Sequence, residues 1–169
     1  KKKVLINMKK IIKDIIDNVD IEIETFIHGA MCAGYSGRCV MSNFLTNRDA
    51  NRGGCSQICR WDFELLDQNK NEIKGEMPFT FCTKDLSMLK HIPEMIDMGI
   101  TSFKIEGRMR SIYYIATVVS IYRKVIDNYY ETGKLFITKE DYLNLEKIFN
   151  RSFTKGFMFN EENDKYVYQ

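Results

Sequence analysis

The chain has 169 residues, of which 44% are hydrophobic and 28% are charged, and its formal net charge is +2. This composition is typical of a globular protein with one ordinary core, and the small net charge indicates no strongly charged partner. No apolar run approaches the ~18 residues of a membrane-spanning helix, and the start lacks the pattern of a signal peptide. We therefore expect a cytoplasmic protein with no membrane association and with reduced cysteines.

The first thirty residues predict a strand, a helix and a second strand. Val4–Ile6 is a short apolar run, and residues 8–18 place isoleucines on one helical face and charged side chains on the other. Residues 21–26 alternate apolar and polar side chains, which is typical of a strand. Because the first strand begins so abruptly, we expect the chain to be a fragment of a larger α/β domain.

Residues 28–60 form a glycine-rich, polar segment, for which we expect a loop with a short helix over about 37–45. Residues 61–82 predict a β-hairpin with a polar turn at 67–71. Asp85 suits the N-cap of a helix over about 85–92.

The remaining segments predict a helix and a strand, followed by a long helix and a last helix. Pro93 suits the first turn of a helix that Gly99 ends, and residues 101–105 predict a strand. A long helix is expected over about 109–132, followed by a last helix that begins with a capping box of Thr138 and Asp141. The expected core stripe of the long helix is Ile115, Val118, Val119, Tyr122, Val125 and Tyr129.

The alternation of strands and helices indicates an α/β fold with a parallel sheet. We expect the C-terminal part of a (β/α) barrel of the TIM type, with an inserted cysteine-rich loop over 28–60 and a hairpin over 61–82. The barrel fragment is expected over 1–160 and an irregular tail over 161–169. A barrel without its first half exposes strand edges, so a homodimer or a swapped assembly is one expected form of the fragment.

Four cysteines lie close together in the polar segment, with the spacing C-x6-C-x15-C-x3-C: Cys32, Cys39, Cys55 and Cys59. Cysteines gathered in such a loop form disulfides, a zinc site or an iron–sulfur site, and a reducing compartment argues against disulfides. Zinc usually takes two short C-x2–4-C pairs, and here only the second pair fits. An iron–sulfur cluster accepts wider loops, so it is the preferred hypothesis and zinc the alternative.

Two other residues qualify this hypothesis. His28 lies near the first cysteine, as a substitute ligand or as a hydrogen-bonding neighbour. Cys82 lies next to Phe79 and Phe81 in a predicted strand and is interpreted as a small buried hydrophobe.

Two carboxylates are predicted at the carboxyl ends of strands, Glu24 and Glu106, and Arg108 follows the second. In (β/α) barrels this edge builds the active site, so these residues are candidates for acid–base work or for clamping an anion. A structural ion pair is the alternative. The arginines near the candidate site suit phosphate or carboxylate binding, or neutralisation of a thiolate cluster: Arg48, Arg52, Arg60, Arg108 and Arg110.

The segment 24–42, ETFIHGAMCAGYSGRCVMS, matches the signature E-x-F-x2-G-[SA]-aliphatic-C-x4-G-x-C-x-aliphatic-S of the peptidase U32 family. The segment 51–60, NRGGCSQICR, resembles the second cysteine segment of this family, and 84–86 and 104–108 resemble two further blocks. The chain is thus similar to U32 proteins from about Val4 to Phe159. Family members have a longer N-terminal region.

The resemblance implies a [4Fe–4S] cluster on Cys32, Cys39, Cys55 and Cys59, with Cys82 as the other candidate for the fourth ligand. The fragment alone is expected to hold this cluster or empty thiols. In pattern the chain is most similar to the branch that makes 5-hydroxyuridine at the tRNA wobble position, for which prephenate is implicated as a hydroxyl source. The expected substrates of the full protein are therefore tRNA and prephenate. The alternatives are a collagenase-like peptidase of unknown catalytic type and another RNA or quinone hydroxylase branch.

Overall fold

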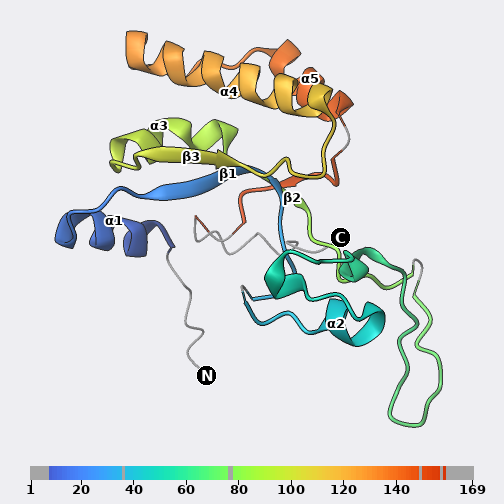
Figure 1. The fold of residues 1–169 in the computed structure, drawn as a ribbon. Coiled ribbons are helices and arrows are strands. Elements are labelled where there is room, and N and C mark those ends of the chain that lie inside the picture. The colour runs from blue at the N-terminus through green and yellow to red at the C-terminus, as the bar shows by residue number, and fades with distance from the viewer. Residues whose placement is uncertain (1–7, 36, 76–77, 149, 157, 159–169) are drawn as a thin grey trace. The chain divides into compact units, whose positions relative to one another are not determined.

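The computed structural model describes residues 8–35, 37–75, 78–148, 150–156 and 158 (Figure 1). These residues divide into two compact units. The first contains the described residues up to Ala30 and from Lys84 onward, and the second is Met31–Thr83. The strand expected at Val4–Ile6 and the tail expected over 161–169 lie outside the described residues.

The first unit contains helices and a small sheet. Its helices are α1 (Met8–Asn18), the 3-10 turn η3 (Leu89–His91), α3 (Ile92–Asp97), α4 (Ile112–Thr132) and α5 (Lys139–Lys147). Its strands are β1 (Glu24–Ala30), β2 (Asp85–Ser87), β3 (Ser102–Ile105) and β4 (Phe153–Thr154). The bounds of α1 match the predicted ones, and β3 begins one residue later than predicted.

The sheet is mixed, with the strand order β3-β1-β2-β4. β1 runs parallel to β3, β2 runs antiparallel to β1, and β4 runs parallel to β2. The prediction of a purely parallel sheet is therefore wrong for this part of the chain. The α/β class is confirmed, and the four described strands form an open sheet.

Two strand and helix boundaries differ from the sequence prediction. β1 begins at Glu24 rather than at residue 21, because pairing with β3 starts there, and it continues through the buried residues 27–29. The helix expected from Asp85 is wrong: Asp85 is the first residue of β2, paired with Ala30, and helical structure starts only at Leu89.

The core of the first unit lies between the sheet and its helices. In Figure 1, α3 and α4 lie on the same side of β1 and β3. The long helix buries Val118, Tyr122 and Val125, as expected, but Ile115 and Val119 are largely exposed. Tyr114 and Ile121 take their place in the core, because the buried stripe is rotated by about one residue from the predicted one.

Capping residues are present at the ends of α4 and α5. Ser111 caps α4 by accepting a hydrogen bond from the backbone N–H of Tyr114, and Gly133 ends it with a φ of 67°. Thr138 and Asp141 form the predicted capping box of α5. No helix in the described part of the chain is long and apolar enough to cross a membrane.

The second unit consists of short helices and one paired extended segment. The helices are α2 (Met41–Thr46) and the 3-10 turns η1 (Ala50–Arg52) and η2 (Ile58–Arg60). The predicted hairpin is confirmed in outline, since Phe63 pairs with Phe79 and Leu66 pairs with Glu72, both antiparallel. These are isolated bridges in the described residues rather than continuous strands.

Candidate functional site

The four cysteines of the C-x6-C-x15-C-x3-C pattern all lie in the second unit, and all are free thiols. The side chains of Cys32 and Cys39 both lie next to Gly34. A Cβ atom at Gly34 would lie 3.6 Å from the Sγ of Cys39 and 3.8 Å from the Sγ of Cys32. Both sulfurs therefore approach one point, and a side chain at residue 34 would crowd it.

Polar bonds tie the first cysteine segment to the second. Asn51 bonds the backbone of Cys39 in both directions: its Oδ1 accepts from the Cys39 N–H at 3.2 Å, and its Nδ2 donates to the Cys39 carbonyl at 3.0 Å. The backbone N–H of Ser56 donates to the buried Ser42 Oγ at 3.0 Å. These contacts hold α2 against the segment that carries Cys55 and Cys59.

The surroundings of Cys55 and Cys59 act on the two thiols in opposite directions. The backbone N–H of Gln57 donates to the Sγ of Cys55 at 3.2 Å, an interaction that favours a negatively charged sulfur. Burial raises the pKa of the Cys59 thiol, and the nearby Arg60 guanidinium opposes this increase. Cys32, Cys55 and Cys82 also raise the pKa of Cys59 by their negative charge, so their sulfurs lie within electrostatic range of it.

The four cysteines are a donor set of the kind that iron–sulfur clusters and zinc ions use. Within the described residues, no three His, Cys, Asp or Glu side chains are placed to hold one metal ion. A zinc ion would need four donors at about 2.3 Å from one point. A cluster spreads its cysteine ligands over a larger group of atoms, and reduced thiols on two tethered segments are compatible with it.

Cys82 differs from the other four cysteines. It is buried, and its Sγ lies 3.7 Å from the carbonyl oxygen of Thr83. The burial agrees with its interpretation as a small hydrophobe. The Cys82 sulfur nevertheless acts on the pKa of Cys59, so it stays a candidate for the fourth ligand.

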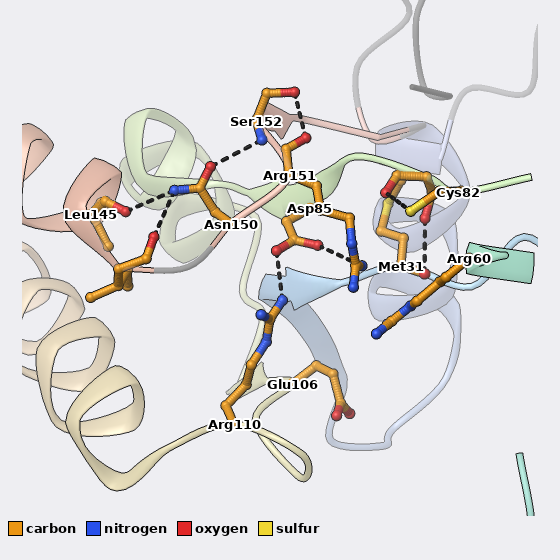
Figure 2. A network of polar contacts seen from close by, with 12 residues as sticks. Met31, Arg60, Cys82, Asp85, Glu106, Arg110, Leu145, Asn150, Arg151 and Ser152 are labelled. Carbon is orange, nitrogen blue, oxygen red and sulfur yellow. Dashed lines mark hydrogen bonds and ion pairs between the residues drawn. The ribbon is translucent and has the colours of Figure 1, made fainter. Parts of the chain in front are cut away.

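A second cluster of polar side chains lies in the first unit, at the end of the sheet where β2 begins (Figure 2). Asp85 is completely buried at the start of β2. Its two carboxylate oxygens accept from Arg110 at 2.7 Å and from Arg151 at 3.5 Å. Both arginine side chains are mostly buried, so the Asp85 carboxylate is paired with two cations away from solvent.

The chain folds so that both arginines reach this edge. Arg110 lies in the turn between β3 and α4, with its guanidinium 4.8 Å from the ring centre of Tyr114. Arg151 lies between α5 and β4, in a turn that Asn150 fixes. Asn150 donates to the carbonyls of Leu145 and Ile148 at the end of α5 and accepts from the backbone of Ser152 (Figure 2).

His28 lies beside this ion network, buried among aromatic rings. Its Nδ1 is 3.2 Å from the Tyr122 hydroxyl, which itself donates to the Ile27 carbonyl at 2.9 Å. Burial, together with the positive charge of Arg110, lowers the pKa of His28 to about 4. The imidazole is therefore neutral at pH 7. Among the described residues, the Nε2 of His28 and the hydroxyl of Tyr114 have no hydrogen-bond partner.

The structure separates two of the predicted catalytic residues. Glu106 follows β3 at its carboxyl end, as expected, and its carboxylate accepts from the backbone N–H of Arg108 at 3.1 Å. Glu24, however, is the first residue of β1, so the prediction that it lies at a carboxyl end is wrong. Its side chain is exposed at the opposite end of the strands. Its carboxylate accepts hydrogen bonds from the Nζ of Lys104 at 2.9 Å and from the Oγ of Ser102 at 3.0 Å.

Sequence reasoning missed the role of Asp85 and gave none to Arg151. Asp85 at the start of an apolar stretch has the pattern of an N-cap, and nothing local distinguishes that pattern from a buried ion pair. The resemblance of 84–86 to a family block was the available signal. Arg151 carried no signal, because its partner lies more than sixty residues earlier in the chain.

The comparisons with known proteins define the class. A family model described as Peptidase family U32 matches residues 7–167, so the chain belongs to this family. Among curated relatives, tRNA hydroxylation protein P1 of Bacillus subtilis (strain 168) is 53% identical over 152 residues, covering 86% of this chain and 36% of the relative.

Two further relatives carry different names. A 23S rRNA 5-hydroxycytidine synthase of Escherichia coli (strain K12) is 40% identical over 116 residues, covering 69% of this chain and 18% of the relative. A collagenase of Porphyromonas gingivalis (strain ATCC BAA-308 / W83) is 37% identical over 142 residues, covering 81% of this chain and 34% of the relative. The chain thus spans little more than a third, or less, of each of these relatives. No solved structure gave a significant match.

Proposed function

We propose that the protein carrying this chain hydroxylates tRNA in the cytoplasm, forming 5-hydroxyuridine at the wobble position. The observation that carries the proposal is the 53% identity, over 86% of the chain, to a relative named for tRNA hydroxylation. A second relative is named for the synthesis of 5-hydroxycytidine in ribosomal RNA. Both names refer to hydroxylation of RNA, and the second also names the hydroxylated base.

We further propose that Cys32, Cys39, Cys55 and Cys59 hold a [4Fe–4S] cluster, with zinc as the alternative. Such a cluster, when bound, supplies one-electron redox chemistry. The Gln57 N–H that donates to Cys55 favours a thiolate there, and the Arg60 charge partly offsets the burial that raises the pKa of Cys59. The two hydrogen bonds of Asn51 to Cys39 fix the backbone of that cysteine.

The substrate pocket in this proposal lies at the sheet edge with Glu106 and Arg108. Hydroxylation replaces a C–H of uracil by C–OH, so the reaction needs an oxygen donor and an acceptor for the two electrons that leave the base. Prephenate, a dicarboxylate, is the proposed donor, and arginine is the side chain that best recognises carboxylates. The complete protein is proposed to close the mixed sheet of the first unit into a (β/α) barrel with its remaining residues.

A peptidase is the second candidate function, because the family bears that name and one relative is named collagenase. His28 is the histidine of the buried polar group, and its neutral, deeply buried imidazole is bonded to Tyr122. That arrangement is unlike an activated nucleophile. The described residues therefore favour the hydroxylase over the peptidase.

The test combines nucleoside analysis with iron measurement. A strain lacking the gene should lose 5-hydroxyuridine derivatives from its tRNA, and the wild-type gene should restore them. A Cys39→Ser variant should not restore them, and the anaerobically purified full-length variant should contain less iron than the wild type. Cys82→Ala tests the other candidate for the fourth ligand, and it should retain both if Cys59 is that ligand. Unchanged tRNA nucleosides in the deletion strain would contradict the hydroxylase proposal. Stoichiometric zinc in a colourless protein would contradict the assignment of an iron–sulfur cluster.

A further inference from the structure

Exposed aromatic residues accompany the cysteine segments of the second unit. Tyr35 lies between Cys32 and Cys39 and is 78% exposed, and Phe44 on α2 is 85% exposed. Trp61, two residues after Cys59, is half exposed. Single exposed aromatic residues are ordinary on protein surfaces, but three beside one candidate reaction centre need a reason.

The cations of the same segment are all arginines. Residues 31–60 contain four arginines, no lysine and one acidic residue, Asp49. The Arg38 guanidinium lies 5.6 Å from the ring centre of Tyr35, and the backbone N–H of Arg38 donates to the Tyr35 carbonyl at 3.0 Å. Arg48 and Arg52 are also exposed, and Arg52 pairs with Asp49 at 3.4 Å.

We propose that Tyr35 and Arg38, together with Phe44 and Arg48, bind an unpaired loop of RNA. This inference rests on the proposed function, in which RNA is the substrate. Unpaired bases stack on exposed aromatic rings and on guanidinium planes, whereas bases inside a duplex offer no free faces. Exposed arginines bind the phosphates between them.

The charge of the segment favours RNA over a protein partner. Arginine is the cation best suited both to stack on a ring and to pair with a phosphate. A collagen-like peptide offers neither a chain of phosphates nor flat bases. The position of Tyr35 and Arg38 between two cysteines also places a stacked base next to the residues that carry the proposed redox chemistry.

Binding of a tRNA anticodon stem–loop to the full-length protein tests the inference. Tyr35→Ala should weaken binding about fivefold to a hundredfold, because stacking on an aromatic side chain contributes about 1–3 kcal/mol per base. Tyr35→Phe should bind like the wild type. Arg38→Ala should reduce the slope of log K against log salt by about 0.7, the value of one phosphate contact on a single strand. The same RNA annealed to its complement should bind equally to wild type and Tyr35→Ala.

Tyr130→Ala is the matched control, because Tyr130 on α4 is 70% exposed in the first unit. It should leave binding unchanged. Circular dichroism and iron content establish that each variant is folded. Wild-type affinity in both Tyr35→Ala and Phe44→Ala would overturn the inference. So would equal loss in Tyr35→Phe, or self-association of the protein that Phe44→Ala abolishes, or capture of a collagen peptide in place of RNA.

The outcomes separate this inference from the proposed function. If tRNA hydroxylation depends on Cys39 but the aromatic variants bind RNA normally, the inference fails and the proposed function stands. If the deletion strain keeps its 5-hydroxyuridine while Tyr35→Ala still loses RNA binding, the RNA surface stands and the proposed reaction fails.

Discussion

Acid should destabilise the protein through His28, before its carboxylates are protonated. Burial and the charge of Arg110 lower the pKa of His28 from 6.5 to about 4 in the folded chain. The unfolded chain therefore takes up this proton near pH 6.5, and the folded chain takes it up only near pH 4. The stability that the neutral imidazole contributes is fully present above pH 7 and is lost as the pH falls through this window.

The magnitude follows from the difference between the two pKa values. One pKa unit corresponds to 1.36 kcal/mol, so the free energy of unfolding should fall by about 3 kcal/mol between pH 7 and pH 4. This is a large part of the 5–15 kcal/mol that stabilises a typical domain. The hydrogen bond between His28 and Tyr122 keeps the ring in place, so the buried proton cannot be accommodated by a small rotation.

Urea unfolding of the full-length protein at several pH values measures this effect. His28→Gln removes the titrating group and should flatten the loss of stability between pH 6.5 and pH 4.5. His91→Gln is the matched control, since it retains His28 and should retain the loss. Equal slopes in wild type and His28→Gln across this window would refute the argument, because they would show that His28 is protonated in the folded chain at its ordinary pKa.

Three other substitutions should have distinct effects. Asp85→Asn replaces the buried carboxylate that accepts from Arg110 and Arg151 by a neutral amide and should cost about 3–5 kcal/mol in urea unfolding, whereas a loss of less than about 1 kcal/mol would show that the network is solvated. Asn51→Ala removes both bonds to the Cys39 backbone and, under the proposed function, should speed iron loss to a chelator; an unchanged rate would contradict the tethering role. Thr138→Ala removes the α5 cap and should cost about 1 kcal/mol with unchanged iron content, measured by thermal unfolding and iron assay.

Helices and their caps could be predicted because their signals are local. The isoleucine spacing of residues 8–18 gave α1 with its correct bounds, and Thr138 with Asp141 gave the capping box of α5. The buried stripe of α4 was predicted less well. Two neighbouring apolar stripes run along that helix, and the packing of Tyr114 and Tyr122 against His28 decides which one is buried.

The candidate site also combines residues with a local signal and residues without one. The four cysteines were predicted as a ligand set from their spacing, because thiols in a polar loop have few structural roles, and this assignment stays a prediction. The prediction that Glu24 lies at a carboxyl end was wrong, since the start of a strand depends on its pairing partner: Glu24 pairs with Ser102 at the first residue of β3. The pairing of Asp85 with Arg110 and Arg151 is equally non-local, and composition or periodicity carries no trace of it.

The buried ion network and the cysteine segment are linked by the course of the chain. The second unit begins directly after Ala30 and ends directly before Lys84, and Ala30 pairs with Asp85 in the sheet. Inside the second unit, the Thr83 hydroxyl donates to the Met31 carbonyl at 2.9 Å, so its two ends are held together. Burial of a carboxylate and two arginines costs desolvation free energy that their mutual attraction only partly offsets. Here the carboxylate lies at the start of β2, where Asp85 pairs with Ala30, so a substitution at Asp85 should disturb the pairing of these two strands as well as the stability of the sheet.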